Sequence, residues 1–266
     1  NAKIVHVDID PSEINKVIQT DLGIVADCKL VLEALSSENV TTAHHEEWIH
    51  YCKQNKQKHP FKYDKNEDDT FSKPQKSIEY IGKITNGDAI VTTDVGQHQM
   101  WAAQFYPFKD HGQWVTSGGL GTMGFGIPSA IGAQLASPDK TVVCFVGDGG
   151  FQMTNQEMAL LPEYNLNVKI VLINNGTLGM VKQWQDKFFN QRFSHSVFND
   201  QPDFIKMAEA YGINGYLIDS SDKLESQIDA AFNHNGPALI EVRISPVEPV
   251  NPMVPSGKSN HEMEGL

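Results

Sequence analysis

Strand-like and helix-like hydrophobic patterns alternate through most of the chain. Continuous apolar runs such as TVVCFVG and KIVLI predict strands buried on both faces, and the segments between them carry apolar residues at helical spacing. Strands are expected at 88–96, 140–150, 167–175, 214–219 and 237–245. Helices are expected at 77–85, 98–105, the end of 117–136, 155–164, 204–212 and 223–232. This alternation predicts an α/β fold, a parallel sheet with helices on both faces.

The N-terminal part of the chain follows a different pattern. A strand over KIVHVDI is followed by a short helical stripe of Ile14, Val17 and Ile18, and then by an amphipathic helix over ADCKLVLEAL. A polar stretch with one helix around EEWIHYCKQN leads into the alternating part. We therefore expect the end of one domain at 1–36, a linker over 37–70, and a domain over 71–266 that ends in a proline-rich, extended arm.

Composition and charge narrow the class of protein. Hydrophobic residues make up 40% and charged residues 20%, as in soluble globular proteins, and the net charge of −12 argues against nucleic acid because a phosphate backbone requires a basic face. Apolar runs fall well short of the roughly 20 residues that span a bilayer. The chain opens inside a strand rather than a signal peptide, and its three cysteines are widely spaced. These features predict a cytoplasmic piece of a longer protein, without a membrane partner.

Two polar groups follow consecutive predicted strands. Asp148 stands in the GDGG after one strand, and Asn175 closes the asparagine pair after the next. The carboxyl ends of parallel strands meet at one rim, so the two side chains are expected close together. Carboxylate and amide oxygens are hard ligands that suit Mg²⁺ or Ca²⁺ rather than zinc. Gly147, Gly149 and Gly150 would let phosphate groups approach the backbone, and the whole stretch predicts a site for a metal and a diphosphate.

The two common phosphate fingerprints do not account for this stretch. GxxxxGK[ST] does not occur in the sequence, so a P-loop is excluded. Gly119, Gly121 and Gly124 have the GxGxxG spacing, but they follow WVTS, which is a poor strand. Histidines and a cysteine between residues 44 and 59 lack a standard zinc spacing and favour a solvated linker.

Five segments of the chain resemble the acetolactate synthase (acetohydroxyacid synthase) family of thiamine-diphosphate-dependent enzymes. They are DVGQHQMWAAQ, SGGLGTMGFGIPSAIGA, GDGGFQMTNQE, LINNGTLGMVKQWQ and PMVPSG. GDG followed by NN indicates the cofactor, and GMVKQWQ points to this family among those that use it. The resemblance covers essentially the whole chain. It implies that residues 1 to about 36 end a Rossmann-like central domain and that 71–266 form the thiamine-diphosphate-binding domain.

The resemblance implies roles around the cofactor. Asp148 and Asn175 would bind Mg²⁺ through side-chain oxygens, and Thr177 through its backbone carbonyl. The residues implied to contact the diphosphate are Gln97, His98, Gly147, Gly149 and Gly150. Met123 would wedge the two cofactor rings into a bent shape, and the Gly121 carbonyl would accept a hydrogen bond from the 4′-amino group. From the residues alone, a core role for Met123 stays open.

A third set of residues is implied to meet the substrate. Met180, Val181 and Trp184 would line the substrate channel and favour 2-ketobutyrate as the second substrate. Met180 and Trp184 are four positions apart and share a helix face. Without the resemblance, the same residues would be interpreted as an ordinary apolar stripe.

The resemblance also implies a reaction and partners. The expected activity is that of a transferase: decarboxylation of pyruvate and carboligation to a second 2-ketoacid, in valine, leucine and isoleucine biosynthesis. A glutamate from another domain of a partner subunit would complete the site at a dimer interface, so these 266 residues alone should be inactive. A structural FAD, bound mostly outside this segment, and a small regulatory subunit are also implied. The alternatives are a pyruvate oxidase, a catabolic acetolactate synthase, or a non-catalytic Mg²⁺–nucleotide module.

Overall fold

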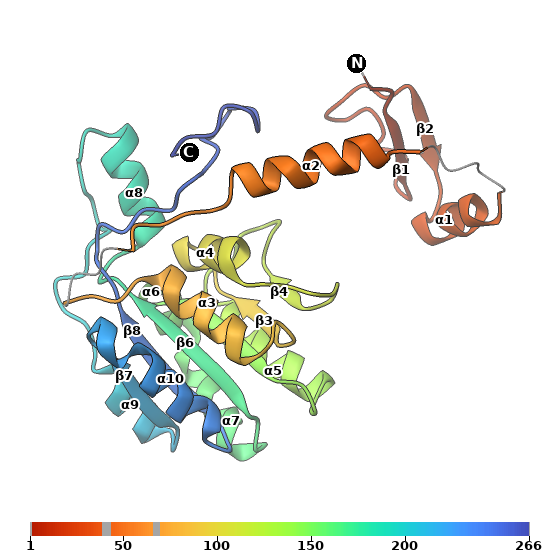
Figure 1. Ribbon diagram of the computed structural model, residues 1–266. Coiled ribbons are helices and arrows are strands. Elements are labelled where there is room, and N and C mark those ends of the chain that lie inside the picture. Colours follow the sequence, from red (N-terminus) through yellow and green to blue (C-terminus); the bar gives the residue numbers. More distant parts are fainter. Residues whose placement is uncertain (1, 39–43, 66–69, 266) are drawn as a thin grey trace. The chain divides into compact units, whose positions relative to one another are not determined.

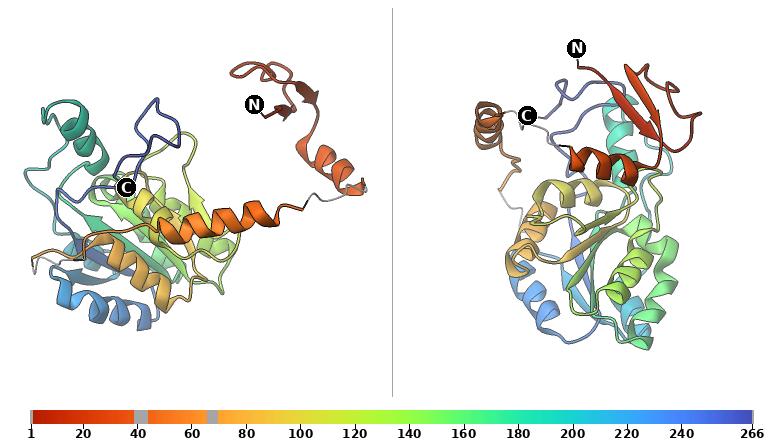
Figure 2. Two further views of the ribbon diagram at one scale, coloured as in Figure 1. Left: turned by 45° about the horizontal axis from the view of Figure 1, so that its top comes forward. Right: turned by 90° about the vertical axis from the view of Figure 1, so that its right-hand side faces the viewer.

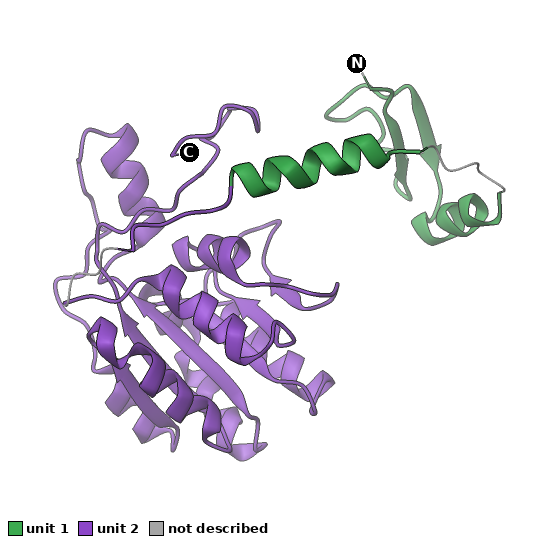
Figure 3. Cartoon of the chain, in the orientation of Figure 1, with its two compact units in different colours: residues 1–59 green, residues 60–266 purple. Residues whose placement is uncertain are grey.

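The chain forms two compact units. The computed structural model describes residues 2–38, 44–65 and 70–265, and the units comprise residues 1–59 and 60–266 (Figure 3). Parts of the predicted linker, at 39–43 and 66–69, lie outside the described residues. Each unit is described separately below.

Unit 1 contains a small parallel sheet. Strands β1 (Val5–Asp8) and β2 (Leu22–Val25) pair in parallel, and α1 (Cys28–Ser37) and α2 (Glu46–Lys58) follow. Asp27 caps α1 by accepting hydrogen bonds from two amides of its first turn. The short helix predicted around Ile14 is wrong: residues 11–18 form turns and bends. Asn15 has a φ of 62°, which breaks a right-handed helix, and its Oδ1 accepts from the Thr20 amide at 2.8 Å. Sequence analysis also missed β2.

Unit 2 is built on a parallel sheet, as predicted, and among the described residues this sheet has six strands, one more than expected (Figure 1). The strand order is β4-β3-β5-β6-β8-β7. The strands are β3 (Ile90–Thr93), β4 (Trp114–Thr116), β5 (Val142–Gly147), β6 (Val168–Asn174), β7 (Asn214–Ile218) and β8 (Ala238–Arg243). β5 and β6 are buried along their full length, which explains their unbroken apolar sequences.

Helices cover both faces of this sheet (Figure 2). Alternate residues of β5 enter two separate cores: Val143 and Phe145 pack with α3, α4 and α10, whereas Val142, Cys144 and Val146 pack with α5, α6, α7 and α9. The helices are α3 (Pro74–Ile84), α4 (Gln97–Phe105), α5 (Gly126–Ala136), α6 (Asp148–Thr154), α7 (Leu160–Glu163), α8 (Gly179–Phe188), α9 (Phe204–Ala210) and α10 (Leu224–Asn233). Two short 3₁₀ helices are η1 (Asn155–Ala159) and η2 (Ser221–Lys223).

Three details of unit 2 differ from the sequence prediction. The segment dismissed as a poor strand is β4, which pairs in parallel with β3 at the edge of the sheet, where a short strand suffices. The strand predicted over 140–150 ends at Gly147, because α6 begins at Asp148 directly after it. The single helix predicted over 155–164 is η1 followed by α7.

The C-terminal arm, defined here as residues 246–265, contains no regular helix or strand among its described residues. Side chains of α4 and α8 donate to its backbone carbonyls, among them Lys182 to Pro246 at 3.0 Å and Gln104 to Pro252 at 3.0 Å. The predicted extended arm is therefore held against the sheet domain. Separately, within the described part of the chain, the helices are too short or too polar to cross a membrane.

Candidate active site

A pocket opens at the carboxyl ends of β3, β5 and β6. We call this edge of the sheet the carboxyl rim. The chain runs from β3 to β4 on one side and then returns to place β5 on the other side, so this rim contains a point where the strand order reverses. Ligands of open α/β sheets bind at such points. The pocket is lined by Val95, Gly96, Gln97, His98, Trp101, Met123, Gly147, Asp148, Gly149, Gly150, Ile173, Asn175, Thr177, Leu178, Gly179, Met180 and Val181.

Asp148 and Asn175 reach this pocket from adjacent strands. Gly147 of β5 pairs with Ile173 of β6, so the residues that follow lie side by side. Asp148 is buried at the start of α6, and its two oxygens accept from the Gly149 amide at 3.0 Å and from Gln201 Nε2 at 2.7 Å. Burial raises the pKa of Asp148 to about 6, and these hydrogen bonds oppose the rise. Burial of the charged Asp148 carboxylate is unfavourable, so a cation bound beside it would stabilise its ionised form.

The two asparagines at the end of β6 have different partners. Asn174 donates to Glu241 Oε1 at 2.9 Å and accepts from the Gly176 amide at 3.1 Å, so it fixes the turn. Asn175 faces the pocket, and its Oδ1 accepts from both the amide and the hydroxyl of Thr177, each at 3.0 Å. The oxygens predicted to hold a metal thus come from one short loop and from the start of α6.

Glycine is required along the wall of the pocket. A Cβ placed on Gly147 would lie 2.8 Å from His98 Nδ1, and one on Gly149 would lie 2.5 Å from Leu178 Cδ2. A Cβ on Gly150 would lie 2.0 Å from Asp94 Oδ1. Side chains therefore fill the space behind these glycines, and their bare backbone faces the pocket.

Two buried polar groups at the rim keep unused hydrogen-bonding capacity. Among the described residues, His98 Nε2 and Asp94 Oδ1 are buried without a partner. Burial lowers the pKa of His98 to about 4, with a hydrogen bond from the ring to the Asp94 backbone opposing it, so the ring is neutral at pH 7. Burial raises the pKa of Asp94, although its Oδ2 accepts from the Gly126 amide at 2.9 Å. Of the two, His98 lines the pocket, so its Nε2 is available to hydrogen-bond a bound group.

Gln97 lines the pocket but is already bound within the protein. Its Nε2 donates to Gln183 Oε1 at 2.8 Å and to the Glu248 carbonyl at 3.1 Å. Its Oε1 accepts from Asn175 Nδ2 at 3.1 Å. The side chain predicted to contact a diphosphate therefore also orients a predicted metal ligand.

Met123 and Gly121 occupy different positions relative to the pocket. Met123 is half-buried in the lining, and its Cε would lie 3.6 Å from a Cβ on Gly149. Gly121 is exposed, has a φ of 74° and is not among the lining residues, although a Cβ there would lie 3.9 Å from Val95 Cγ1. Met123 thus stands beside the glycine wall, and Gly121 stands just outside it.

The three residues predicted for a substrate channel are split between two pockets. Met180 and Val181, in the first turn of α8, line the main pocket. Val181 and Trp184 line a separate surface pocket with Gln185, Phe189 and Arg192. Trp184 is 42% exposed. Val181 is the residue that the two pockets share.

Sequence reasoning missed Asp94, Gln201 and Gln183. Asp94 follows β3 as Asp148 follows β5, so its position after a strand end was a usable signal. Gln201 lies in an irregular segment far along the chain and gave no pattern. Gln183 stands in the quoted GMVKQWQ segment, but its burial shows only in the folded chain.

Models of one protein family match two parts of this chain. The family model described as "Thiamine pyrophosphate enzyme, C-terminal TPP binding domain" matches residues 94–242, which contain the whole pocket lining. The chain belongs to the thiamine pyrophosphate enzyme family. The central-domain model of the same family matches residues 1–35.

Several curated members of the thiamine pyrophosphate enzyme family are similar along the whole chain. The acetolactate synthase large subunit of Lactococcus lactis is 50% identical over 100% of this chain and 46% of its own length. The acetolactate synthase isozyme 2 large subunit of Escherichia coli is 42% identical over 99% of this chain and 47% of its own. The chloroplastic acetolactate synthase 1 of Nicotiana tabacum is 42% identical over 96% and 40%. The chain spans about half the length of these relatives.

The pocket residues fit thiamine pyrophosphate, which is thiamine diphosphate. The glycine wall offers bare backbone for a diphosphate, and the unpartnered His98 Nε2 is a free polar atom beside it. Asp148, Asn175 and the Thr177 carbonyl supply hard oxygen donors. Within the described residues, no group of three or more histidine, cysteine, aspartate or glutamate side chains is arranged to hold a metal ion. A magnesium ion that keeps diphosphate oxygens and water among its ligands does not need such a group.

Proposed function

We propose that unit 2 holds Mg²⁺ and thiamine diphosphate at the carboxyl rim of its sheet and that the whole protein is an acetolactate synthase. The observation that carries the proposal is the convergence of Asp148, Asn175 and the glycine wall on one pocket, in a chain 50% identical along its full length to an acetolactate synthase large subunit. The proposed reaction is decarboxylation of pyruvate and carboligation to a second 2-ketoacid. It would serve branched-chain amino acid biosynthesis.

Different residues of the pocket would bind the metal ion, the diphosphate and the rings of the cofactor. Asp148, Asn175 and the Thr177 carbonyl would bind the metal ion. The amides of Gly149 and Gly150, with His98 and Gln97, would contact the diphosphate, and Met123 would press against the cofactor between its rings. Gly121 would contribute its backbone carbonyl from outside the wall. Support comes from the lining of the pocket and from the unpartnered His98 Nε2 among the described residues.

Thiamine diphosphate, when bound, supplies a thiazolium ring that acts as the electron sink for carbon–carbon bond cleavage and formation. The protein's contribution is position and exclusion of water. Met180 and Val181 form an apolar wall beside the polar groups, so they would exclude water from the side on which the 2-ketoacid binds. Trp184 stands one helical turn beyond Met180 and would contact the outer part of the substrate path.

The partners follow from the names of the relatives and from the resemblance described above. Relatives are named as large subunits, which supports a smaller, regulatory partner. A homodimer with the active site at its interface is proposed on the same resemblance. FAD has less support: Asp8 and Asp10 accept hydrogen bonds from the Asp10 and Ser12 amides, which is a structural use of both side chains. We therefore assign no step to a flavin.

The test is an assay of the whole natural polypeptide with pyruvate, Mg²⁺ and thiamine diphosphate. We expect acetolactate, with one CO₂ released for two pyruvate molecules consumed. Acetaldehyde or acetate as the main product would replace the proposal with a related thiamine-diphosphate enzyme. Calorimetry with thiamine diphosphate, ATP and NAD separates the remaining alternative, since tighter binding of ATP or NAD would indicate a nucleotide-binding module.

A further inference from the structure

Gln183 is a buried polar residue with no role in the proposed function. It lies on α8 between the substrate-facing Val181 and the exposed Trp184, and its side chain is turned inward, only 8% exposed. Both ends of its amide are engaged in hydrogen bonds. Their direction matters because the oxygen of an amide only accepts and the nitrogen only donates.

The backbone of Val250, in the C-terminal arm, fixes the orientation of Gln183. The Val250 amide donates to Gln183 Oε1 at 3.0 Å, and Gln183 Nε2 donates to the Val250 carbonyl at 3.3 Å. A backbone N–H cannot accept and a backbone carbonyl cannot donate. The Gln183 amide can therefore satisfy Val250 in one orientation only, with its oxygen toward the N–H.

Gln183 in turn fixes the orientation of Gln97. Gln183 Oε1 accepts from Gln97 Nε2 at 2.8 Å, and the Glu248 carbonyl accepts from the same nitrogen at 3.1 Å. Because both of these oxygens are acceptors, the Gln97 amide must turn its nitrogen toward them. Its oxygen is left to face the pocket, where it accepts from Asn175 Nδ2 at 3.1 Å.

The orientation of the Gln97 amide in turn affects that of the Asn175 amide. Gln97 Oε1 accepts from the Asn175 nitrogen, and the Thr177 amide and hydroxyl both donate to the Asn175 oxygen at 3.0 Å, so Gln97 and Thr177 favour the same orientation of this amide. Only the oxygen of an asparagine amide can bind Mg²⁺. We propose that Gln183 is a positioning residue that, through Gln97 and together with Thr177, holds Asn175 with its oxygen presented to the metal site. This inference rests on the proposed Mg²⁺ and thiamine diphosphate site.

A merely structural role for Gln183, fastening the arm, can be separated from this relay. Gln104 on α4 also donates to the arm, to the Pro252 carbonyl at 3.0 Å, and it is not among the residues bonded to Gln97 or Asn175. Replacing Gln104 therefore removes an arm contact and leaves the relay intact. Gln104→Met is the matched control for Gln183→Met, since methionine has the same length and no hydrogen-bonding amide.

The experiment measures the Mg²⁺ concentration that gives half-maximal binding of thiamine diphosphate to the whole natural polypeptide, followed by tryptophan fluorescence and calorimetry. We expect Gln183→Met to raise that concentration by roughly 10-fold, the lower end of the effect typical of losing an outer-shell partner of a metal ligand, because Gln97 stands between Gln183 and Asn175. Gln104→Met should leave it within about twofold. Equal shifts in the two variants, or no shift in Gln183→Met, would overturn the relay.

A second variant keeps the test decisive if Gln183→Met does not fold. Val250→Pro removes the backbone N–H that donates to Gln183 Oε1, leaves the Val250 carbonyl in place, and replaces a buried side chain of the arm. A smaller shift in the same direction is expected, and an unchanged Mg²⁺ requirement in a folded Val250→Pro protein would contradict the relay. If the unmodified protein binds thiamine diphosphate without any need for Mg²⁺, the proposed metal site itself fails and the relay fails with it.

Discussion

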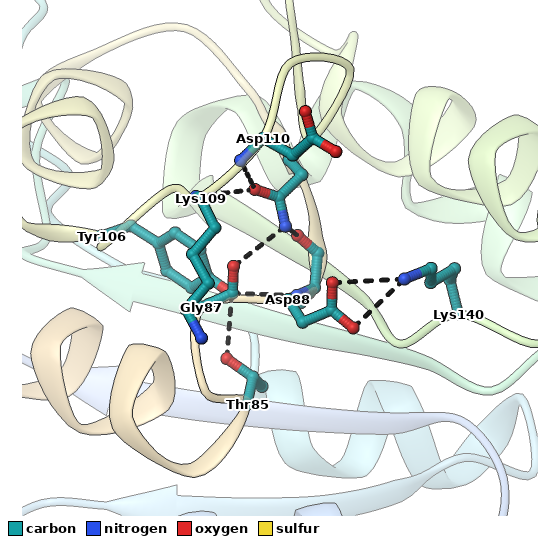
Figure 4. A network of polar contacts seen from close by, with 9 residues as sticks. Thr85, Gly87, Asp88, Tyr106, Lys109, Asp110 and Lys140 are labelled. Atoms are coloured by element: carbon teal, nitrogen blue, oxygen red, sulfur yellow. Dashed lines mark hydrogen bonds and ion pairs between the residues drawn. The ribbon is translucent and has the colours of Figure 1, made fainter.

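The two ends of the same parallel sheet use buried polar groups differently. At the amino end of β3, Tyr106 completes its hydrogen bonds within the protein (Figure 4), and so does Gln113. Tyr106 joins the Thr85 hydroxyl at 2.9 Å and the Ala89 amide at 3.2 Å. The Gln113 amide donates to the Gly87 carbonyl at 2.9 Å and accepts from the backbone amides of residues 109 and 110. The hydrogen-bond partners of both side chains therefore come from within the chain.

At the carboxyl end of the same strands, buried polar groups remain incomplete. Among the described residues, Asp94 Oδ1 and His98 Nε2 have no partner, and burial raises the pKa of Asp148 to about 6. The contrast has an exception, since the Gln134 carbonyl oxygen near the amino end is also unpartnered within the described chain. That atom stands alone, whereas His98 lines the pocket and Asp94 Oδ1 lies directly behind its glycine wall.

This difference separates stability from function within one sheet. A buried polar group without a partner costs about 1–3 kcal/mol, so a cluster of them is retained only where something else repays the cost. A bound metal and diphosphate would do so at the carboxyl rim. Substitutions at the carboxyl end should therefore weaken binding of the metal and diphosphate. Substitutions at the amino end should lower stability alone.

The largest effect is expected for Asp148→Asn. The change preserves size but removes the only carboxylate among the proposed metal ligands, so Mg²⁺-dependent binding of thiamine diphosphate should weaken by more than about 100-fold. The melting temperature of the cofactor-free protein should change little, because the substitution also removes a buried charge. Asp88→Asn is the control: Asp88 is exposed, pairs with Lys140 at 3.1 Å and lies at the other end of the sheet. Equal loss of binding in both variants would contradict the assignment.

Gly150→Ala should damage the same rim through packing. The added Cβ would lie 2.0 Å from Asp94 Oδ1, so the carboxylate or the start of α6 must move, at a cost of about 1–3 kcal/mol in the free energy of unfolding. Gly132→Ala on α5 is matched, because no atom lies within 4 Å of its added Cβ and alanine favours a helix by about 0.5–1 kcal/mol. Urea denaturation of the two variants should give changes of opposite sign. A stabilised Gly150→Ala protein would show that the wall is not close-packed.

Tyr106→Phe tests the amino end. The hydroxyl that joins Thr85 and the Ala89 amide is lost, which should lower the free energy of unfolding by about 1–2 kcal/mol. Binding of thiamine diphosphate should be unchanged, since Tyr106 does not line the pocket. Chemical denaturation and calorimetry on one preparation check both parts. Weaker cofactor binding in a folded variant would mean that the two ends are coupled.

The sequence predicted what depends on local pattern. The apolar runs of β5 and β6 and the helical stripes between them predicted a parallel sheet, and the strand-end positions of Asp148 and Asn175 predicted their proximity; the structure confirms both. β4 was missed because an edge strand of three residues carries too little pattern. The helix predicted at Ile14 is wrong because a single left-handed residue, Asn15, redirects the chain.

The partners of the site residues could not be predicted, because they come from distant parts of the chain. Gln201 reaches Asp148 across 53 positions, and Val250 reaches Gln183 across 67. Nothing in local composition distinguishes these residues from exposed polar ones. Gln97 shows the limit most clearly, because its motif suggested one contact, whereas the fold gives it three partners inside the protein.

The smallest predicted effect concerns Lys169, a buried lysine of β6 at the amino end. Its Nζ donates to the His234 and Gly236 carbonyls at 2.8 and 2.7 Å, and burial lowers its pKa from 10.5 to about 8. Because the folded pKa is the lower one, the unfolded chain holds more protons between pH 8 and 10.5, so the contribution of Lys169 to stability rises with pH across that window. Below about pH 8 the cost of the buried charge is fully present.

Comparison with Lys169→Met isolates this contribution, because other titrating groups are common to both proteins. The stability of the natural protein minus that of the variant should increase from pH 8 to pH 10, by at most about 1.4 kcal/mol per pH unit. A neutral amine still has two N–H groups for the two carbonyls, so the contacts survive the loss of the proton. Urea denaturation at several pH values measures the difference. A difference that stays flat would mean that Lys169 keeps an ordinary pKa, so that even its charge is accommodated at the end of the sheet where polar groups complete their bonds.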